Sequence, residues 1–139
     1  MPSHQRRGVE VNIVLDTNGY SAMANGSREI AKLLESADGI LVPAVVVGEL
    51  MYGFLKGSRC ADNEAGLNQF LEQPGVSFQP VTRSIAERYG YVKAALKTKG
   101  MPIPENDIWI AATALETGCR LLSYDGHFDK VGGLVRIAP

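Results

Sequence analysis

Short apolar runs alternate with amphipathic segments along this chain, and this alternation restricts the fold more than any other feature of the sequence. The clearest helix places Ile85, Tyr89, Val92 and Leu96 on one face. The sequence predicts strands at residues 11–15, 40–42, 76–79, 121–123 and 134–137, and helices at residues 28–36, 44–54, 62–72, 83–99 and 105–117. Strands that alternate with helices predict an α/β fold, with a parallel sheet covered by helices on both faces.

The 139 residues are enough for one compact domain. The polar segment 1–8 precedes the first apolar run, so we expect a disordered N-terminal arm followed by a single domain over residues 9–139. No apolar stretch approaches the ~20 residues of a membrane-spanning helix, and the amino terminus lacks the apolar core of a signal peptide. Cys60 and Cys119 have no C-x-x-C spacing. These features predict a cytoplasmic protein with two reduced thiols and no membrane contact.

Four acidic residues fall where an α/β fold collects its ligands, beyond the carboxyl ends of the parallel strands. Asp16 directly follows the first predicted strand, and Asp125 comes two residues after the strand that ends at Ser123. Glu49 lies on the helix after the second strand, and Asp107 lies in the first turn of a later helix. A fold of this class can therefore bring all four carboxylates to one end of its sheet.

Each acid also has a purely structural explanation. Asp16 can cap a helix, Asp107 can complement a helix dipole, and Asp125 precedes a glycine in a common turn pair. Glu49 is harder to explain in this way, because its neighbours are apolar and an unpaired carboxylate among apolar residues is costly. Taken singly, only Glu49 indicates a site, so the case for a shared site depends on the wider sequence pattern.

Four motifs surround these acids, in the order Leu15-Asp16-Thr17-Asn18, Gly48-Glu49-Leu50-Met51-Tyr52-Gly53, Asn106-Asp107-Ile108-Trp109-Ile110-Ala111-Ala112-Thr113-Ala114 and Leu122-Ser123-Tyr124-Asp125-Gly126-His127-Phe128. With these motifs the chain resembles the PIN-domain family from about Val11 to Ile137, and within it the VapC-type toxins of bacterial and archaeal toxin–antitoxin pairs. The resemblance implies a three-layer α/β/α sandwich with a mainly parallel central sheet of four to five strands.

The resemblance also implies roles for residues within the motifs. The implied catalytic and metal-binding carboxylates are Asp16, Glu49, Asp107 and Asp125, and the implied supporting residues are Thr17, Asn18 and Ser123. The expected cofactor is Mg²⁺ or Mn²⁺, with one or two ions per site, because these hard cations prefer oxygen ligands. The expected reaction is hydrolysis of RNA phosphodiester bonds to 5′-phosphate and 3′-hydroxyl ends, for which a divalent ion activates the attacking water.

The formal net charge of −1 conceals a local excess of positive charge. The chain has 14 basic and 15 acidic residues, and setting aside the four proposed ligands leaves 11 acids and a balance of +3. Residues 83–99 carry five basic side chains against one acidic one, which is also common on a solvated helix face. We expect Arg83, Arg88 and Lys97 of this segment to contact the RNA backbone. His127 has no acid–histidine–serine arrangement around it and is expected at the surface or beside the site.

Protein partners are also implied by the resemblance. It implies a homodimer and a cognate VapB-type antitoxin whose tail covers the acidic pocket. Tyr52, Phe54 and Leu55 closely follow Glu49, and they either form an exposed apolar groove for such a partner or pack in the core.

Three other functions are compatible with parts of the pattern. A housekeeping PIN nuclease in RNA processing or decay would carry the same acids, although the compact chain favours the toxin. A catalytically silent PIN-like module that binds RNA or protein is disfavoured because all four acids are intact. A haloacid-dehalogenase-like phosphatase would need a second aspartate two residues after Asp16, where this chain has Asn18.

Overall fold

The computed structural model describes residues 10–139, and the arm expected over residues 1–8 lies outside this range. Within it, five strands form one sheet in the order β3-β2-β1-β4-β5, and every neighbouring pair is parallel. The strands are β1 (Asn12–Leu15), β2 (Gly39–Pro43), β3 (Val76–Gln79), β4 (Arg120–Leu122) and β5 (Arg136–Ile137). The predicted α/β fold with a mainly parallel sheet of four to five strands is confirmed.

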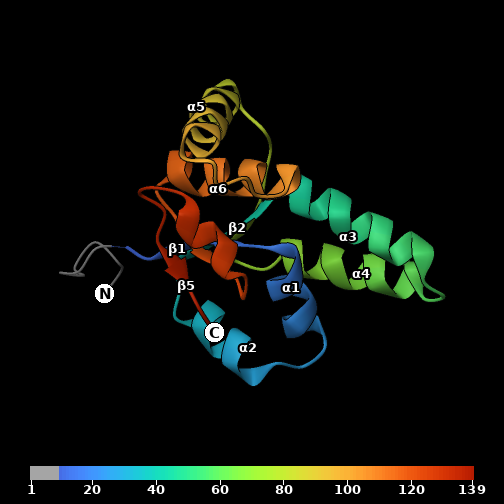
Figure 1. Cartoon of the computed structure of the whole chain (residues 1–139). Helices are drawn as coiled ribbons and strands as arrows, with labels where there is room; N and C mark the ends of the chain where they lie inside the picture. Colours follow the sequence, from blue (N-terminus) through green and yellow to red (C-terminus); the bar gives the residue numbers. More distant parts are fainter. Residues whose placement is uncertain (1–9) are drawn as a thin grey trace.

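Helices cover both faces of this sheet. They are α1 (Thr17–Ala24), α2 (Arg28–Glu35), α3 (Ala44–Lys56), α4 (Cys60–Leu71), α5 (Arg83–Lys99), α6 (Glu105–Thr117) and the short 3-10 helix η2 (Gly126–Lys130). Helix α6 packs on β1 and β4, and α5 lies against the outer side of α6 (Figure 1). Helix α2 lies on the other side of the sheet, and α3 and α4 extend side by side from one end of it (Figure 1). No helix in the described range is long and apolar enough to cross a membrane.

The central strands are buried on both faces, which explains why their sequences are apolar without alternation. Ile13, Val14 and Leu15 of β1 and Leu121 and Leu122 of β4 are each at most 1% exposed. Because β1, β2 and β4 run parallel, their carboxyl ends open onto the same end of the sheet. From β1 the chain first adds β2 and β3 on one side of the sheet and then β4 and β5 on the other. The point where the strand order changes direction in this way, between β1 and β4, is where α/β folds bind ligands.

Helix α1 is the one α-helix of the described range that the sequence analysis does not predict. Its segment Thr17–Ala24 has few apolar residues at helical spacing. Asp16 begins the helix as its N-cap, and its Oδ1 accepts the backbone N–H of Gly19 at 2.7 Å. Tyr20 anchors the helix in the core, where it is 5% exposed. The capping function considered for Asp16 is therefore confirmed, and it fixes where this carboxylate lies.

Candidate active site

The four predicted acids meet at the end of the sheet. Asp16 follows β1 directly, and Asp125 lies in the loop after β4. Glu49 is in the second turn of α3, and Asp107 is in the first turn of α6. All four line one pocket of about 210 Å³, whose lining residues are Asp16, Thr17, Asn18, Glu49, Asp107, Ile110, Asp125 and Phe128. The structure thus brings the acids together, while their part in catalysis remains a prediction.

A second, larger hollow lies elsewhere in the molecule. It has a volume of about 560 Å³, lies between α1, α2, α4 and the start of β3, and is lined by none of the four acids. The smaller pocket is the candidate active site because carboxylates from four separate segments converge on it, which no single cap or turn explains.

Asp16 is the most buried acid of the site, at 6% exposure. Burial is the main cause that raises its pKa above the ordinary value, and the charges of Asp125 and Glu49 raise the pKa further. Hydrogen bonds from the Ser123 hydroxyl and the Gly19 backbone N–H act in the opposite direction. The charged form of Asp16 is therefore unfavourable in the metal-free site, and a bound cation would relieve that cost.

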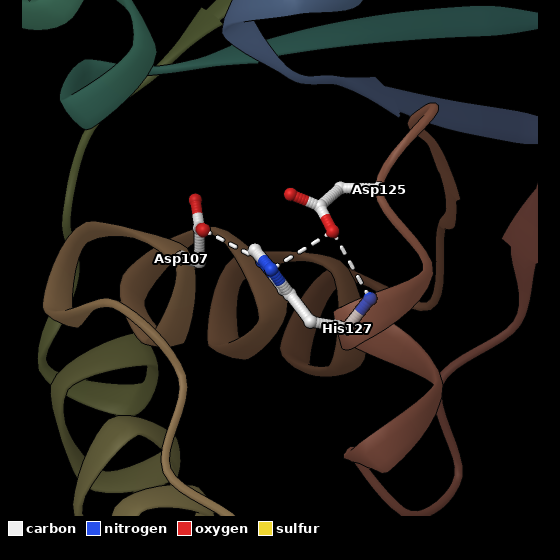
Figure 2. A group of neighbouring side chains, drawn as sticks. All are labelled: Asp107, Asp125 and His127. Atoms are coloured by element: carbon white, nitrogen blue, oxygen red, sulfur yellow. Dashed lines mark hydrogen bonds and ion pairs between the residues drawn. The ribbon is translucent and has the colours of Figure 1, made fainter.

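His127 lies between two of the acids (Figure 2). Its Nε2 lies 2.7 Å from Asp107 Oδ2, and its Nδ1 lies 2.8 Å from Asp125 Oδ1. The His127 backbone N–H also donates to Asp125 Oδ1 at 3.1 Å. Nε2 is fully enclosed, and its close contact with Asp107 is an ion pair rather than a well-formed hydrogen bond. One ligand atom from each of Asp107, Asp125 and His127 lies within 4.8 Å of the others, close enough for one metal ion to contact all three.

Asp107 experiences opposing influences in the same pocket. Burial is the main cause that raises its pKa, and the contact with His127 is the main influence that lowers it. The charges of Glu49 and Asp125 raise the pKa again. The Asp107 carboxylate thus lies among three titratable groups, as expected at a functional site.

Glu49 is held at both carboxylate oxygens. The Thr17 hydroxyl donates to Oε1 at 2.5 Å, and the Asn106 side-chain amide donates to Oε2 at 3.2 Å. Thr17 thus supports the site through Glu49, and Asn106, which was not predicted as a site residue, does the same. Asn18, also expected to support the site, lines the pocket, but its side chain makes no hydrogen bond to other described residues.

Ser123 connects two of the acids. It is 0% exposed, and its Oγ accepts the Asp125 backbone N–H at 3.0 Å. Its hydroxyl also bonds to Asp16, which lowers the pKa of that carboxyl. A hydroxyl at this position therefore joins the end of β1 to the loop after β4.

The three predicted RNA-contact residues lie on α5 and do not line the acidic pocket. Arg83 pairs with Glu87 on its own helix, and Arg88 pairs with Glu116 of α6 at 3.0 Å. Lys97 is exposed and makes no ion pair with other described residues. Two of the three cations are thus partly compensated, so this helix attracts phosphate less strongly than its charge count indicates.

Comparison with known proteins places this geometry in a family. The model of the PIN domain matches residues 13–134, which is most of the chain and includes all four acids. The chain belongs to the PIN-domain family. Within the family, it is 34% identical over 122 residues to the Haemophilus influenzae protein named ribonuclease VapC2, a match that covers 85% of this chain and 90% of that protein. The chain is therefore a member of the VapC group of PIN domains.

Two solved structures show the same fold as this VapC-group chain. VapBC2 from Rickettsia felis, bound to a DNA fragment from its promoter, has a chain that superposes with a TM-score of 0.84 at 23% identity, covering 93% of this chain and 99% of that one. VapBC-5 from Mycobacterium tuberculosis, a member of the VapBC family of toxin–antitoxin systems, gives a TM-score of 0.70 at 23% identity, covering 91% and 99%. At this identity the likeness establishes the architecture, and it agrees with the expected sandwich.

Proposed function

We infer that this chain is an endoribonuclease and the toxin of a toxin–antitoxin pair, and we propose that its activity depends on a divalent metal ion. The observation that carries the proposal is the convergence of four carboxylates on one pocket in a member of the VapC group. The name of the Haemophilus influenzae relative supplies the substrate class, RNA. The VapBC assemblies of similar fold supply the partner class, a VapB-type antitoxin. A homodimer is part of the same proposal.

The donor set of the pocket fits a hard divalent cation. Carboxylate oxygens are the ligands that Mg²⁺ and Mn²⁺ prefer. The pKa of Asp16 is raised by burial and by two neighbouring carboxylates, so positive charge is favourable there. We therefore propose Mg²⁺ or Mn²⁺, one or two ions per site, held by Asp16, Glu49, Asp107 and Asp125. When bound, such an ion would activate water and neutralise charge on the phosphate.

The residues around the pocket orient the reacting groups within this proposal. Thr17 and Asn106 fix both oxygens of Glu49, so this carboxylate can hold the attacking water in one orientation. The water oxygen forms a bond to phosphorus while the bond to the 3′ oxygen breaks, which leaves 5′-phosphate and 3′-hydroxyl ends. His127 contacts two carboxylates of the pocket, Asp107 and Asp125, and helps to orient them.

Two surfaces outside the pocket belong to the proposal. We propose that the RNA backbone contacts three basic side chains of α5, those of Arg83, Arg88 and Lys97. Arg83 and Arg88 would exchange their ion pairs with glutamates for contacts with phosphate, whereas Lys97 has no ion pair with other described residues. On α3, Tyr52 and Leu55 are 64% and 69% exposed, which favours the groove over core packing for these two side chains. Because they follow Glu49 on the same helix, we propose that the antitoxin covers them on its way to the pocket.

Incubating the purified chain with total RNA, with and without Mg²⁺ or Mn²⁺, tests the nuclease. We expect cleavage that requires the ion and produces 5′-phosphate ends, and we expect none with Asp107→Asn. Cleavage by Asp107→Asn at the wild-type rate, or no cleavage of any RNA by the wild type, would contradict the proposal. Growth arrest on expression, relieved by the co-expressed antitoxin, separates a toxin from a housekeeping nuclease. Expression without any effect on growth would favour the housekeeping function.

A further inference from the structure

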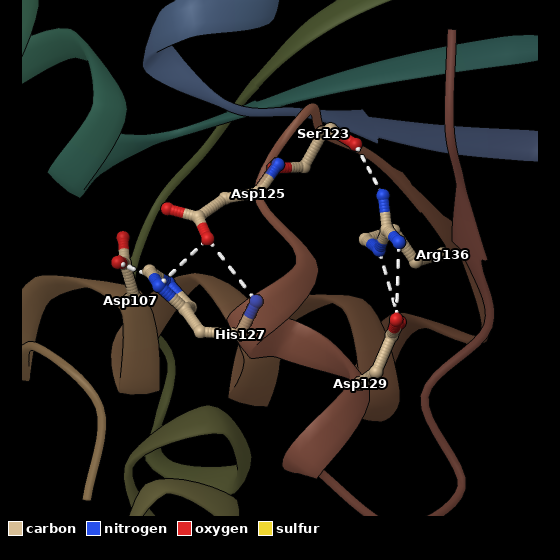
Figure 3. Close-up of polar contacts among 6 residues, drawn as sticks. All are labelled: Asp107, Ser123, Asp125, His127, Asp129 and Arg136. Carbon is tan, nitrogen blue, oxygen red and sulfur yellow. Dashed lines mark hydrogen bonds and ion pairs between the residues drawn. The ribbon is translucent and has the colours of Figure 1, made fainter.

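The loop that presents Asp125 and His127 to the pocket is anchored at both ends by one side chain, Arg136 of β5 (Figure 3). At the start of the loop, Arg136 Nη1 donates to the Ser123 backbone carbonyl at 3.0 Å. At the other end, Arg136 Nε and Nη2 donate to the two carboxylate oxygens of Asp129 at 2.9 and 3.0 Å. One guanidinium therefore closes the segment from Ser123 to Asp129 with three hydrogen bonds.

The geometry of this contact makes it more than an ordinary surface ion pair. The planar guanidinium fork matches both oxygens of Asp129, and such two-point, charge-assisted pairs are among the strong hydrogen bonds of proteins. The Arg136 side chain is only 16% exposed, although that of Asp129 is 61% exposed. The guanidinium also lies beside the turn of the loop, because Nη2 is 3.9 Å from where a β-carbon on Gly126 would stand.

Besides Arg136, the loop is anchored by Phe128, whose side chain is 1% exposed and belongs to the hydrophobic core. Between its ends, Asp125 is held by its backbone N–H bond to Ser123 Oγ and by its Oδ1 contacts with His127. The helix η2 that follows is a short 3-10 helix, whose hydrogen bonds have poorer geometry than those of an α-helix. Asp125 itself is exposed, so core packing does not hold it. Phe128 holds the later part of the loop, so the position of Asp125 depends mainly on these local bonds and on the contact that Arg136 makes with the Ser123 carbonyl.

We propose that Arg136 is a positioning residue of the site: by tying the Ser123 carbonyl to the Asp129 carboxylate, it sets where Asp125 and His127 stand in the pocket. Arg136 does not line the pocket and acts through these two residues. Its effect on cleavage rests on the proposed function, whereas its effect on the loop is a property of the chain alone. The test therefore measures the conformation of the loop in the metal-free protein, without RNA, and separately measures Mn²⁺ binding.

The first measurement is an NMR spectrum of the His127 ring nitrogens in the metal-free protein, and the second is calorimetric titration with Mn²⁺. In Arg136→Gln we expect the His127 signals to shift or broaden and Mn²⁺ affinity to fall by about 10- to 100-fold, the usual effect of losing a residue that orients a metal ligand. Asp129→Asn should act in the same direction. The double variant should be no worse than Arg136→Gln alone, because both changes break the same contact. Arg136→Lys should resemble Arg136→Gln, because an ammonium cannot reproduce the fork.

Arg120→Gln is the matched control. Arg120 is an exposed arginine on the neighbouring strand β4 and has no ion pair with other described residues, so its variant should match the wild type in both measurements. Unchanged His127 signals and Mn²⁺ affinity in folded Arg136→Gln would overturn the proposal. If Arg136→Gln does not fold, Asp129→Asn decides in the same way, because Asp129 is a surface residue. Should the wild type cleave no RNA, the metal-free spectrum still tests the loop, so the two proposals fail separately.

Discussion

The fit of Gly19 beneath the Asp16 carboxylate gives a sharp test of how the site is built. A β-carbon at position 19 would stand 2.9 Å from Asp16 Oδ1, 3.0 Å from Leu15 Cδ1 and 3.4 Å from the Leu122 backbone oxygen. The same Oδ1 accepts the Gly19 N–H at 2.7 Å, so Asp16 cannot retreat without weakening the N-cap of α1. Gly19→Ala should therefore disturb both the helix start and a proposed metal ligand.

Opposing effects set the size of this change. Alanine is favoured over glycine inside a helix by about 1 kcal/mol. Overpacking at a tight site costs about 1–3 kcal/mol, and a weakened N-cap costs about 1 kcal/mol. Gly19→Ala should therefore lower the free energy of unfolding by about 1–3 kcal/mol. Gly90→Ala, in the middle of α5 with nothing within 4 Å of the added carbon, should raise it by about 0.5–1 kcal/mol.

Urea unfolding of the metal-free wild type and both variants measures these differences. We expect Gly90→Ala to be at least as stable as the wild type and Gly19→Ala to be less stable, with midpoints of thermal unfolding shifted by roughly 3–4 °C per kcal/mol. Weaker Mn²⁺ binding by Gly19→Ala should accompany the loss, because Asp16 moves. If Gly19→Ala proved as stable as Gly90→Ala, the close approach to Asp16 would not exist in solution and the reasoning would be refuted.

Three further predictions concern charge and hydrogen bonding. Because the pKa of Asp16 is raised above 3.8 in the folded protein, the stability provided by its protonated form is lost as pH rises through the folded value. Metal-free Asp16→Asn should thus melt above the wild type at about pH 7 and lose this advantage below about pH 3.8; a lower melting temperature at both pH values would contradict the burial argument. Thr17→Val removes the hydrogen bond to Glu49 and should slow single-turnover cleavage by about tenfold or more without unfolding the chain, whereas an unchanged rate would exclude that support. Charge reversal on α5 in Arg83→Glu, Arg88→Glu and Lys97→Glu should weaken RNA binding and flatten its salt dependence. Unchanged affinity and an unchanged slope of affinity against salt concentration in all three variants would rule out that surface.

The elements that a local pattern specifies could be predicted from the sequence. β1 is buried on both faces and so is a continuous apolar run, and α5 packs on one side and so carries an apolar stripe. Helix α1 has neither signal, because it depends on the Asp16 cap and on one buried tyrosine, Tyr20. The meeting of the four acids was predictable in outline. Each acid either follows a strand or lies near the start of a helix, and these positions are at the same end of the sheet.

The contacts that sequence analysis could not predict join distant elements, both for His127, which was expected at the surface or beside the site, and for Arg136, which was not considered. His127 follows Asp125 closely, which could have suggested their contact, but its approach to Asp107 depends on where η2 lies against α6. Arg136 reaches the loop from β5, and no local pattern encodes that distance. The charge count of α5 could not include the pairing of Arg88 with a glutamate of α6, because that contact arises only in the folded chain.

The central claim is that the acidic pocket binds the divalent ion on which RNA cleavage depends. Calorimetric titration of the metal-free wild type and Asp107→Asn with Mn²⁺, beside cleavage rates over the same Mn²⁺ range, tests it most directly. We predict one or two bound ions in the wild type, a cleavage rate that saturates as the site fills, and binding weakened by about tenfold or more in Asp107→Asn with cleavage abolished. Cleavage that persists in chelator, or Mn²⁺ binding that is unchanged in Asp107→Asn, would contradict the account.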